Sequence, residues 1–379
     1  MQCVSAGDCS ASTPVCTAKN MCVECTANNE CSGATPVCNL DTNICVACGS
    51  DADCASSICT SAGACADPSE VVYVDAGGTD GSTCGSATAP CRTLSYAVTQ
   101  TSATRNFVSM APGAYNDTFE LDGATALDLH GHGAGITSTT QGSAFVFDQT
   151  ITIRDVTFDG GSGAIATLVL TGGAADYILD DVTVLHGATG IESAGGVTAT
   201  GLTVHDAGYA VQLTGGSFSV DRATIYSCGY GIAATAASTL QLTNAMMYGF
   251  STGLAVDLTN IAGATIAFST LVSARAAAPA TVACPSGGTI SASIIWALGS
   301  TAVPVTGCNL ITGSIVGPTP VAGAGSGDPL FVDTAGSNFE IGSGSPAIDQ
   351  LTTGPSDDYK GDHRPVNGRW DVGAYEYKP

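Results

Sequence analysis

Residues 182–225 read VTVLHGATGIESAGGVTATGLTVHDAGYAVQLTGGSFSVDRATI and contain three copies of one short pattern. Each copy is an apolar residue, a threonine and a second apolar residue. Related pairs recur throughout residues 151–295, and we call the second member of each pair a marker. The markers are Phe158, Val184, Val204, Ile225, Met247, Leu271 and Ile295, at steps of 26, 20, 21, 22, 24 and 24 residues. A period in the twenties with two-residue alternation inside each unit predicts a β-solenoid, in which each coil stacks on the previous one.

A second recurring position supports this interpretation. Seven residues past four of the markers come Ile191, Val211, Ile232 and Leu254, preceded by Gly190, Ala210, Gly231 and Gly253. We interpret these positions as a second strand, entered through a corner where a column of small residues lets the backbone bend. The residue between the members of each pair should point outward: Thr157, Thr183, Thr203, Thr224, Met246, Thr270 and Ile294. No unit has room for a crossover helix, so neighbouring parallel strands must come from successive coils.

The composition limits the possible functions. The chain has 379 residues, of which 48 are glycine, 44% are hydrophobic and 11% are charged, which favours a folded chain over a disordered one. The net charge is -23 and the only lysines are Lys19, Lys360 and Lys378, so nucleic acid is not an expected partner. No apolar run approaches the roughly 20 residues that span a bilayer, so no membrane span is expected.

Residues 1–66 form a separate cysteine-rich module. It holds 12 of the 17 cysteines, in three groups of four: Cys3, Cys9, Cys16, Cys22; Cys25, Cys31, Cys38, Cys45; and Cys48, Cys54, Cys59, Cys65. Such short repeats cannot bury enough apolar surface alone, so we expect six disulfides, two per repeat, with the connectivity left open. Zinc is the alternative, because Cys-x-x-Cys is a zinc spacing. Disulfides require an oxidising compartment, so we expect export after removal of a leader that this chain does not contain.

The cysteine module resembles the repeats at the N-terminus of secreted bacterial surface proteins, which implies a stalk. Residues 70–120 carry a second resemblance, in YVDAGGTDGS (73–82), APCRTLSYAV (89–98) and VSMAPGAY (108–115). These motifs are similar to the opening of right-handed parallel β-helix proteins of the pectate-lyase-like superfamily. The resemblance implies an all-β, right-handed parallel β-helix with a short N-terminal helix that caps one end. We also expect Cys84 and Cys91 to close a loop. Asp75, Asp80 and Asp117 could hold calcium, but without a recognised ligand spacing we interpret them as loop acids.

The predicted β-helix body covers residues 121–327 and contains three further cysteines. Cys284 and Cys308 each lie 13 residues past a marker, and therefore in one column of adjacent coils. Stacked strands lie about 4.8 Å apart, which is within the range that a disulfide bridges. We therefore predict a Cys284–Cys308 disulfide. Cys228 remains as the odd cysteine, expected to be a small buried or loop thiol.

A polar and aromatic strip follows the markers. Its candidate ligand-binding residues are Asp159, His186, His205, Asp206, Tyr226 and Tyr248. Stacking predicts His186 beside Asp206 and His205 beside Tyr226. Tyrosine faces that stack on sugars, together with histidine and aspartate that bond hydroxyls, suit a carbohydrate. An ordinary turn decorated with polar residues is the other interpretation.

No catalytic residue is assigned. The column order of His186, Asp206 and Ser227 puts the aspartate in the middle, whereas nucleophile activation needs the histidine there. The predicted body contains three arginines: Arg154, Arg222 and Arg275. Asp155, Asp181 and Asp221 lie near the first two of them. This arrangement fits surface ion pairs better than the site of a lyase or hydrolase. The leading function is an extracellular or bacterial cell-surface, non-enzymatic protein that recognises a polysaccharide or surface protein or builds an assembly. The alternative is a polysaccharide lyase or glycoside hydrolase.

The last part of the chain is expected to close the solenoid. Residues 258–327 contain no acidic residue. An outer face with so few charged side chains could pack on the C-terminal segment, on another copy or on a surface. Residues 328–379 resemble the closing segment of bacterial surface β-helix proteins, so we expect them to lie back along the coils. We expect Asp362, Arg364 and Asp371 to fix loops there, with Arg364 and Asp371 as catalytic groups the minor alternative.

Overall fold

The computed structural model describes residues 3–121, 126–138, 145–173, 175–251, 254–273, 280–284, 287–298, 303–308 and 310–379. The chain divides into two compact units, residues 1–111 and residues 112–379. The first unit is rich in disulfides and the second is rich in parallel strands, and each is described by itself.

The first unit begins with three small disulfide-bonded repeats. In every repeat the first cysteine pairs with the third and the second with the fourth: Cys3–Cys16, Cys9–Cys22, Cys25–Cys38, Cys31–Cys45, Cys48–Cys59 and Cys54–Cys65. The repeats contain η1 (Ala6–Asp8), β1 (Val15–Cys16), β2 (Cys22–Val23), η2 (Asn28–Glu30), β3 (Val37–Asn39), β4 (Ile44–Val46) and η3 (Asp51–Asp53). All twelve sulfurs are therefore bonded to sulfur, which rules out the zinc alternative for this module.

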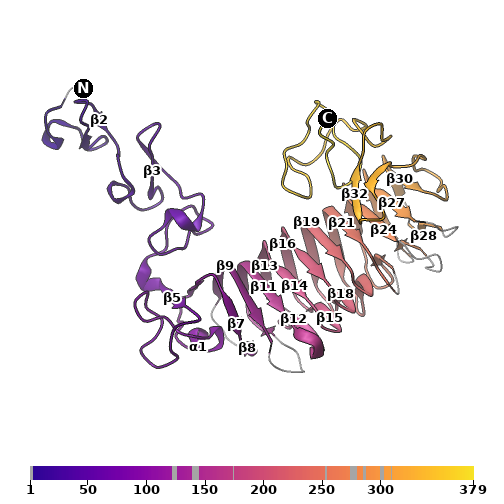
Figure 1. The fold of residues 1–379 in the computed structure, drawn as a ribbon, viewed down its shortest axis with the longest axis horizontal. Coiled ribbons are helices and arrows are strands. Elements are labelled where there is room, and N and C mark those ends of the chain that lie inside the picture. Colours follow the sequence, from indigo (N-terminus) through magenta and orange to yellow (C-terminus); the bar gives the residue numbers. More distant parts are fainter. Residues whose placement is uncertain are drawn as a thin grey trace. The chain divides into compact units, whose positions relative to one another are not determined.

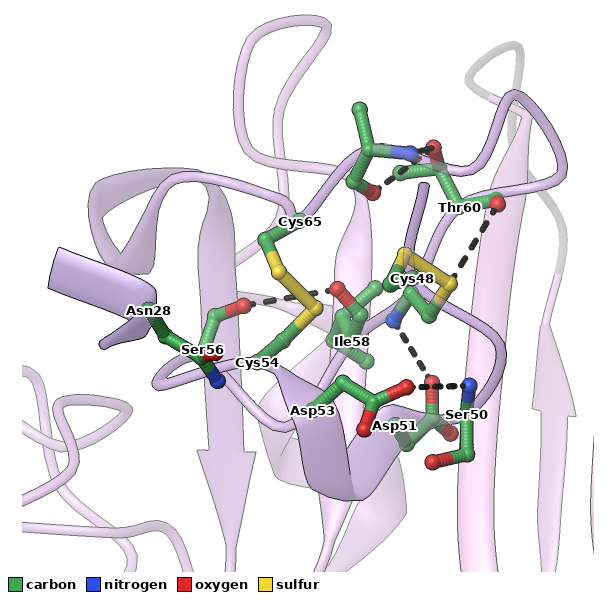
Figure 2. Close-up of a disulfide and its surroundings, with 12 residues drawn as sticks. Asn28, Cys48, Ser50, Asp51, Asp53, Cys54, Ser56, Ile58, Thr60 and Cys65 are labelled. Atoms are coloured by element: carbon green, nitrogen blue, oxygen red, sulfur yellow. Dashed lines mark hydrogen bonds between the residues drawn. A yellow bond between two sulfur atoms is a disulfide. The ribbon is translucent and has the colours of Figure 1, made fainter. Parts of the chain in front are cut away.

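An acidic side chain organises each repeat as well. In the third repeat, Asp53 accepts a hydrogen bond from the backbone N–H of Ser50 at 2.9 Å (Figure 2). It also accepts one from the N–H of Gly49 at 2.9 Å. Asp51 accepts one from the N–H of Cys59 at 2.6 Å. Asp8 and Glu30 occupy the position of Asp53 in the first and second repeats. Each accepts hydrogen bonds from backbone N–H groups of its own repeat, and these bonds lower its pKa. Short loops that bury little apolar surface are thus held by covalent bonds and carboxylates.

The remainder of the first unit has regular secondary structure. It contains η4 (Pro68–Glu70), β5 (Val71–Val74), α1 (Leu94–Val98) and β6 (Phe107–Met110), and β5 pairs in parallel with β6. Thr93 caps α1 by accepting the N–H of Tyr96. Cys84 and Cys91 are disulfide-bonded, as expected. The short helix predicted in this region is present, and its role as an end cap stays a prediction.

The second unit is a parallel β-helix, visible in Figure 1 as successive strands lying side by side. Each coil contributes strands to two kinds of sheet. The first two sides of the coils are β7 (Ala114–Asn116), β9 (Leu127–Thr137), β11 (Ile151–Asp159), β13 (Asp176–Asp180), β14 (Thr183–Leu185), β16 (Gly196–Thr200), β17 (Thr203–His205), β19 (Ser217–Tyr226), β21 (Thr239–Tyr248), β23 (Ala264–Ala267), β24 (Thr270–Ser273), β26 (Gly288–Ser291), β27 (Ile294–Ala297), β29 (Leu310–Thr312) and β30 (Ile315–Gly317). The third side is β8 (Phe119–Leu121), β10 (Phe145–Phe147), β12 (Ala166–Leu170), β15 (Thr189–Ser193), β18 (Tyr209–Leu213), β20 (Tyr230–Ala234), β22 (Val256–Asp257), β25 (Val282–Ala283) and β28 (Val305–Thr306). A short η5 (Gly161–Gly163) follows β11.

The register confirms the predicted stacking. Phe158 pairs with Val184, Val184 with Val204, and the remaining markers follow in order up to Ile295. All seven markers are fully buried, so they form one interior column. The threonine column is also in register on the opposite face of the strands. Burial of such apolar columns is the main favourable contribution to the folding of a coil that makes no contact beyond its neighbours.

The corners correct one part of the sequence interpretation. The bend before the third side is made by residues with a left-handed backbone, His186, Asp206, Ser227 and Gly249, at φ values of 64°, 56°, 53° and 74°. Glycine at position 231 serves a different purpose, because a Cβ there would lie 1.9 Å from the carbonyl oxygen of Ala255.

The predicted place of Leu254 in the second-strand column is wrong. Ile232 pairs with Val256, because the corner before β22 is two residues longer than the preceding ones. Gly253 lies outside the described residues.

The C-terminal segment packs along the coils. It contains the antiparallel pair β31 (Phe331–Asp333) and β32 (Asn338–Ile341), and it covers Met246, Thr270 and Ile294 of the outward column. Arg364 anchors it: its guanidinium is 0% exposed and donates to Glu376 Oε2 at 3.0 Å and to Asn244 Oδ1 at 3.2 Å. The outer face of residues 258–327, which lacks acidic side chains, is therefore partly buried by the C-terminal segment of the same chain.

Candidate functional site

An aromatic ladder runs along the outward side of the second strands. His205, Tyr226 and Tyr248 are register partners on β17, β19 and β21. The rings of His205 and Tyr226 are stacked at 4.8 Å with 13° between their planes, and those of Tyr226 and Tyr248 at 5.5 Å with 14°. The predicted neighbourhood of His205 and Tyr226 is thus present. Burial raises the pKa values of Tyr226 and Tyr248, so both phenols stay neutral hydrogen-bonding groups near pH 7.

His186 and Asp206 occupy neighbouring positions of one corner column, as the stacking predicts. Their side chains, however, have other partners. His186 Nδ1 lies 2.6 Å from Asp159 Oδ1, one coil earlier, and Asp206 Oδ2 lies 2.8 Å from His205 Nδ1 on its own coil. Asp159 and His186 therefore form a separate pair beside the ladder.

A second ladder was not predicted from the sequence. Tyr209 and Tyr230 are register partners on β18 and β20, with ring centroids 4.6 Å apart and 10° between the planes. A signal was available: both tyrosines lie five residues past a marker, Val204 and Ile225 respectively. The two ladders lie on either side of the corner that carries Asp206 and Ser227.

A groove of about 500 Å³ lies at this corner. Its walls combine the second ladder with small and polar corner residues: Ala188, Asp206, Ala207, Gly208, Tyr209, Ser227, Gly229, Tyr230 and Ser251. The coils stack so closely at the base of the groove that a Cβ at Gly208 would lie 2.4 Å from the carbonyl oxygen of Ala188. Asp206 and Ser227 are exposed, so their oxygens are available to a ligand.

The rings cover one another only within each ladder: among the described residues, Tyr226 has a ring partner on both sides, whereas Tyr209 and Tyr230 have only each other. Ring edges and hydroxyl groups therefore follow one another along the ladders. The expectation that tyrosine faces stack on sugars stays a prediction. The edges of aromatic rings carry partial positive charge, and phenol hydroxyls both donate and accept hydrogen bonds. The corner therefore suits a ligand rich in hydroxyl groups lying across the ring edges.

The described lining of the groove carries a negative charge, supplied by one carboxylate. Asp206 is the charged residue among the described residues that line it, with 49% of its side chain exposed. No lysine or arginine lines the groove within the described part of the chain. An acidic ligand would meet an unfavourable local charge as well as the net charge of -23.

A different corner gathers charged residues. Arg154 Nη1 lies 3.3 Å from Asp180 Oδ2, and Arg154 Nε lies 3.6 Å from Asp128 Oδ1. Asp181 shares the left-handed corner column with Arg222, at φ values of 51° and 58°. Burial first, then the charge of Asp180, raises the pKa of Asp181, while Arg222 opposes that rise. Arg275 lies outside the described residues.

The acids considered for calcium are engaged locally. Asp75 accepts the N–H of Gly77, Asp80 accepts the N–H groups of Arg92 and Thr93, and Asp117 accepts the N–H of Thr118. None of the three belongs to a group of candidate metal ligands among the residues that the structure describes. Such bonds fit loop acids, and no residue is assigned to a cofactor.

Stacked register, interior columns and left-handed corners together define a parallel β-helix protein, preceded by a disulfide-rich module. Neither a protein-family model nor a curated protein matches the chain. Among solved structures, a crystal structure of pectate lyase Pel9A is similar, with a TM-score of 0.48 and 12% identity over 81% of this chain and 96% of that one. That likeness concerns the fold alone, and no residue or activity is carried over from it. Among the described residues, no helix is long and apolar enough to cross a membrane.

Proposed function

We propose that this protein is an extracellular, non-enzymatic β-helix protein that recognises a neutral glycan at the corner groove. The observation that carries the proposal is the pair of tyrosine-containing ladders on either side of the exposed Asp206 and Ser227. A glycan chain has many hydroxyl groups and weakly polar C–H faces, and the groove offers hydroxyls, a carboxylate and ring edges along its length.

The groove favours a neutral chain over a polyuronate. Each uronate would place a carboxylate near Asp206 with no lysine or arginine among the described lining residues to offset it. Like charges in contact at a binding surface cost several kcal/mol by general experience. A neutral chain avoids this cost and lets Asp206 accept hydrogen bonds from hydroxyls, which are about twice as strong when the acceptor is charged.

The disulfides support an extracellular setting. Eight disulfides in one chain fit an oxidising compartment, because cytosolic proteins keep their thiols reduced. Residues 1–66 then serve as a stalk outside a bacterial cell. A surface protein as partner, or assembly of several copies, would use another face; the late coils, proposed for assembly, are partly covered by the C-terminal segment.

A binding panel tests the proposal. Soluble oligosaccharides of xylan, mannan, galactan and cellulose are titrated against the full chain, with oligogalacturonate as the charged comparison. We expect one or more neutral chains to bind, and the double variant Tyr209→Ala/Tyr230→Ala to weaken that binding by about tenfold or more, a loss of about 1.4 kcal/mol. The matched control is Thr198→Ala, which removes an exposed side chain from β16. Binding of oligogalacturonate alone, or equal binding by all three proteins, would refute the proposal.

A carbohydrate-active enzyme is the second candidate, supported by the charged corner. Burial raises the pKa of Asp181, which shares its corner column with Arg222, and a raised pKa is a feature of carboxyl groups that act as general acids. Incubation with polygalacturonate and with the neutral polysaccharides, followed by assays for unsaturated uronates and reducing ends, tests this candidate. Product formation that disappears in Asp181→Asn would favour the enzyme over the binding protein.

A further inference from the structure

A second cavity lies where the C-terminal segment packs over the outward side of β19 and β21. Its volume is about 210 Å³. It is lined from the coils by Thr224, Met246 and Tyr248, and from the C-terminal segment by Ser337, Asn338, Phe339, Glu340, Tyr359 and Lys360. Tyr248 is the last ring of the His205–Tyr226–Tyr248 ladder, so the cavity begins where that ladder passes under the segment.

Two aromatic rings form an angled wall of this cavity. Tyr248 and Phe339 have ring centroids 5.1 Å apart and planes inclined at 53°, and Phe331 meets Phe339 edge-on at 5.4 Å. Because these two rings are inclined, they do not cover each other as the stacked rings of the ladders do, and part of a ring face is left for a ligand inside the cavity.

The opposite wall is polar but electrically balanced. Glu340 accepts a hydrogen bond from the hydroxyl of Tyr359 at 3.1 Å and forms an ion pair with the ammonium group of Lys360. That same ammonium lies 5.7 and 5.6 Å from the ring centroids of Tyr359 and Tyr375. The hydrogen bond with Glu340 raises the pKa of Lys360, so the ammonium group keeps its charge near neutral pH and offsets that of its ion-pair partner.

A partly open ring face opposite a polar, neutral wall selects an uncharged polyhydroxylated ring. The volume lies below the roughly 300–1,000 Å³ of cavities for drug-sized ligands, which limits the occupant to one ring. We propose that this cavity is a second binding site, which takes a single neutral sugar residue. The ligand class rests on the proposed function, whereas the place and the one-residue limit rest on the cavity itself.

Monosaccharides separate this site from the corner groove. Glucose, galactose and N-acetylglucosamine are each titrated against the full chain by ligand-observed NMR, with galacturonate as the charged comparison. Thr224→Trp fills the cavity from β19, and Thr198→Trp, the same substitution at an exposed position of β16 outside the cavity, is its matched control. Glu340→Gln keeps the shape of the side chain but leaves the charge of Lys360 unbalanced. This variant therefore tests the site independently of any change in packing that the tryptophan at position 224 causes.

We expect one neutral monosaccharide to bind, Thr224→Trp and Glu340→Gln to weaken that binding by about tenfold, and Thr198→Trp and Tyr209→Ala/Tyr230→Ala to leave it unchanged. Absence of monosaccharide binding, or loss of it only in the tyrosine variant, would overturn the inference. Failure of the proposed function looks different, because it appears as a lack of oligosaccharide binding at the corner and does not depend on Thr224 or Glu340.

Discussion

Individual residues decide where the backbone of this β-helix can turn and how closely its coils approach. Asp206 and Ser227 adopt a left-handed backbone that costs more for most residue types than for glycine, asparagine, aspartate and histidine. Gly231 has no side chain because the carbonyl oxygen of Ala255 occupies the space. The sequence indicated small residues near the corners, but it could not tell which of them bend the chain and which only allow close stacking.

Replacement of Gly231 tests this distinction. In Gly231→Ala, the new Cβ would lie 1.9 Å from Ala255 O and 3.0 Å from Met247 Cε, so a coil must shift. We expect a loss of about 1–3 kcal/mol in the free energy of unfolding, measured by denaturant titration. Gly173→Ala is the control, because nothing lies within 4 Å of its new Cβ. Equal stability of the two variants would contradict the stacking geometry.

The pH dependence of the C-terminal segment should reflect Asp371. Its carboxylate accepts the N–H groups of Asp349 and Tyr377, yet burial outweighs these bonds and raises its pKa from 3.8 to about 6. A raised pKa favours the protonated form in the folded state. This contribution, about 2–3 kcal/mol, is present below about pH 4 and is lost as the pH rises through about 6.

The melting temperature at pH 4 and pH 7 measures this contribution. We expect Asp371→Asn to be less stable overall but to lose less stability between the two pH values than the wild-type protein. Asp176→Asn, at an exposed position of β13, is the control and should keep the wild-type pH dependence. An unchanged pH dependence in Asp371→Asn would show that other carboxylates account for it.

At the scale of strands and coils, the period of the sequence predicts the fold because stacking repeats one register. Alternation and spacing alone were enough to predict the column of markers and the column of outward threonines, and both columns are present. The ladders form across the marker steps of 21 and 22 residues, where the register pairs the rings directly. Side-chain partners such as Asp159 for His186 depend on corner geometry, which the spacing does not specify.

The disulfide between neighbouring coils tests the stacking of late elements. Cys284 and Cys308, 24 residues apart in sequence, have Cα atoms 4.7 Å apart and are bonded. Closing a loop of this length is worth about 3 kcal/mol in the chain-entropy model. We expect Cys284→Ser/Cys308→Ser to melt several degrees lower than the wild-type protein.

Alkylation without reductant gives an independent check of the same pairing. Cys228 is the free cysteine, buried, with a pKa raised by burial to about 11. We expect mass spectrometry of the wild-type chain to show one added alkyl group after unfolding and none before. Three added groups would mean that one disulfide, such as Cys284–Cys308, had not formed.

At the scale of the molecule, the C-terminal segment makes the second unit complete. Met246, Thr270 and Ile294 point outward from their strands but are buried by residues of this segment. The sequence predicted that the segment lies back along the coils, from its aromatic content and from resemblance. It could not predict the buried Arg364 anchor to Asn244, because these residues are 120 positions apart.

Removal of residues 328–379 should expose this face. We expect the shortened chain to keep the circular dichroism of a β protein but to self-associate, since exposed apolar patches drive association. Light scattering after size-exclusion chromatography, compared with the full chain, measures the mass. A shortened chain with the same mass per particle and the same melting temperature as the full chain would mean that the segment contributes little.

The central claim is that a neutral glycan lies in the groove between the two ladders. Hydrogen–deuterium exchange, with and without the neutral oligosaccharide that binds best in the panel, tests it most directly. We predict slower exchange in peptides covering residues 203–213 and 224–234, and unchanged exchange in residues 151–159. Protection confined to the charged corner around Asp181 and Arg222, or none at residues 203–213, would contradict the claim.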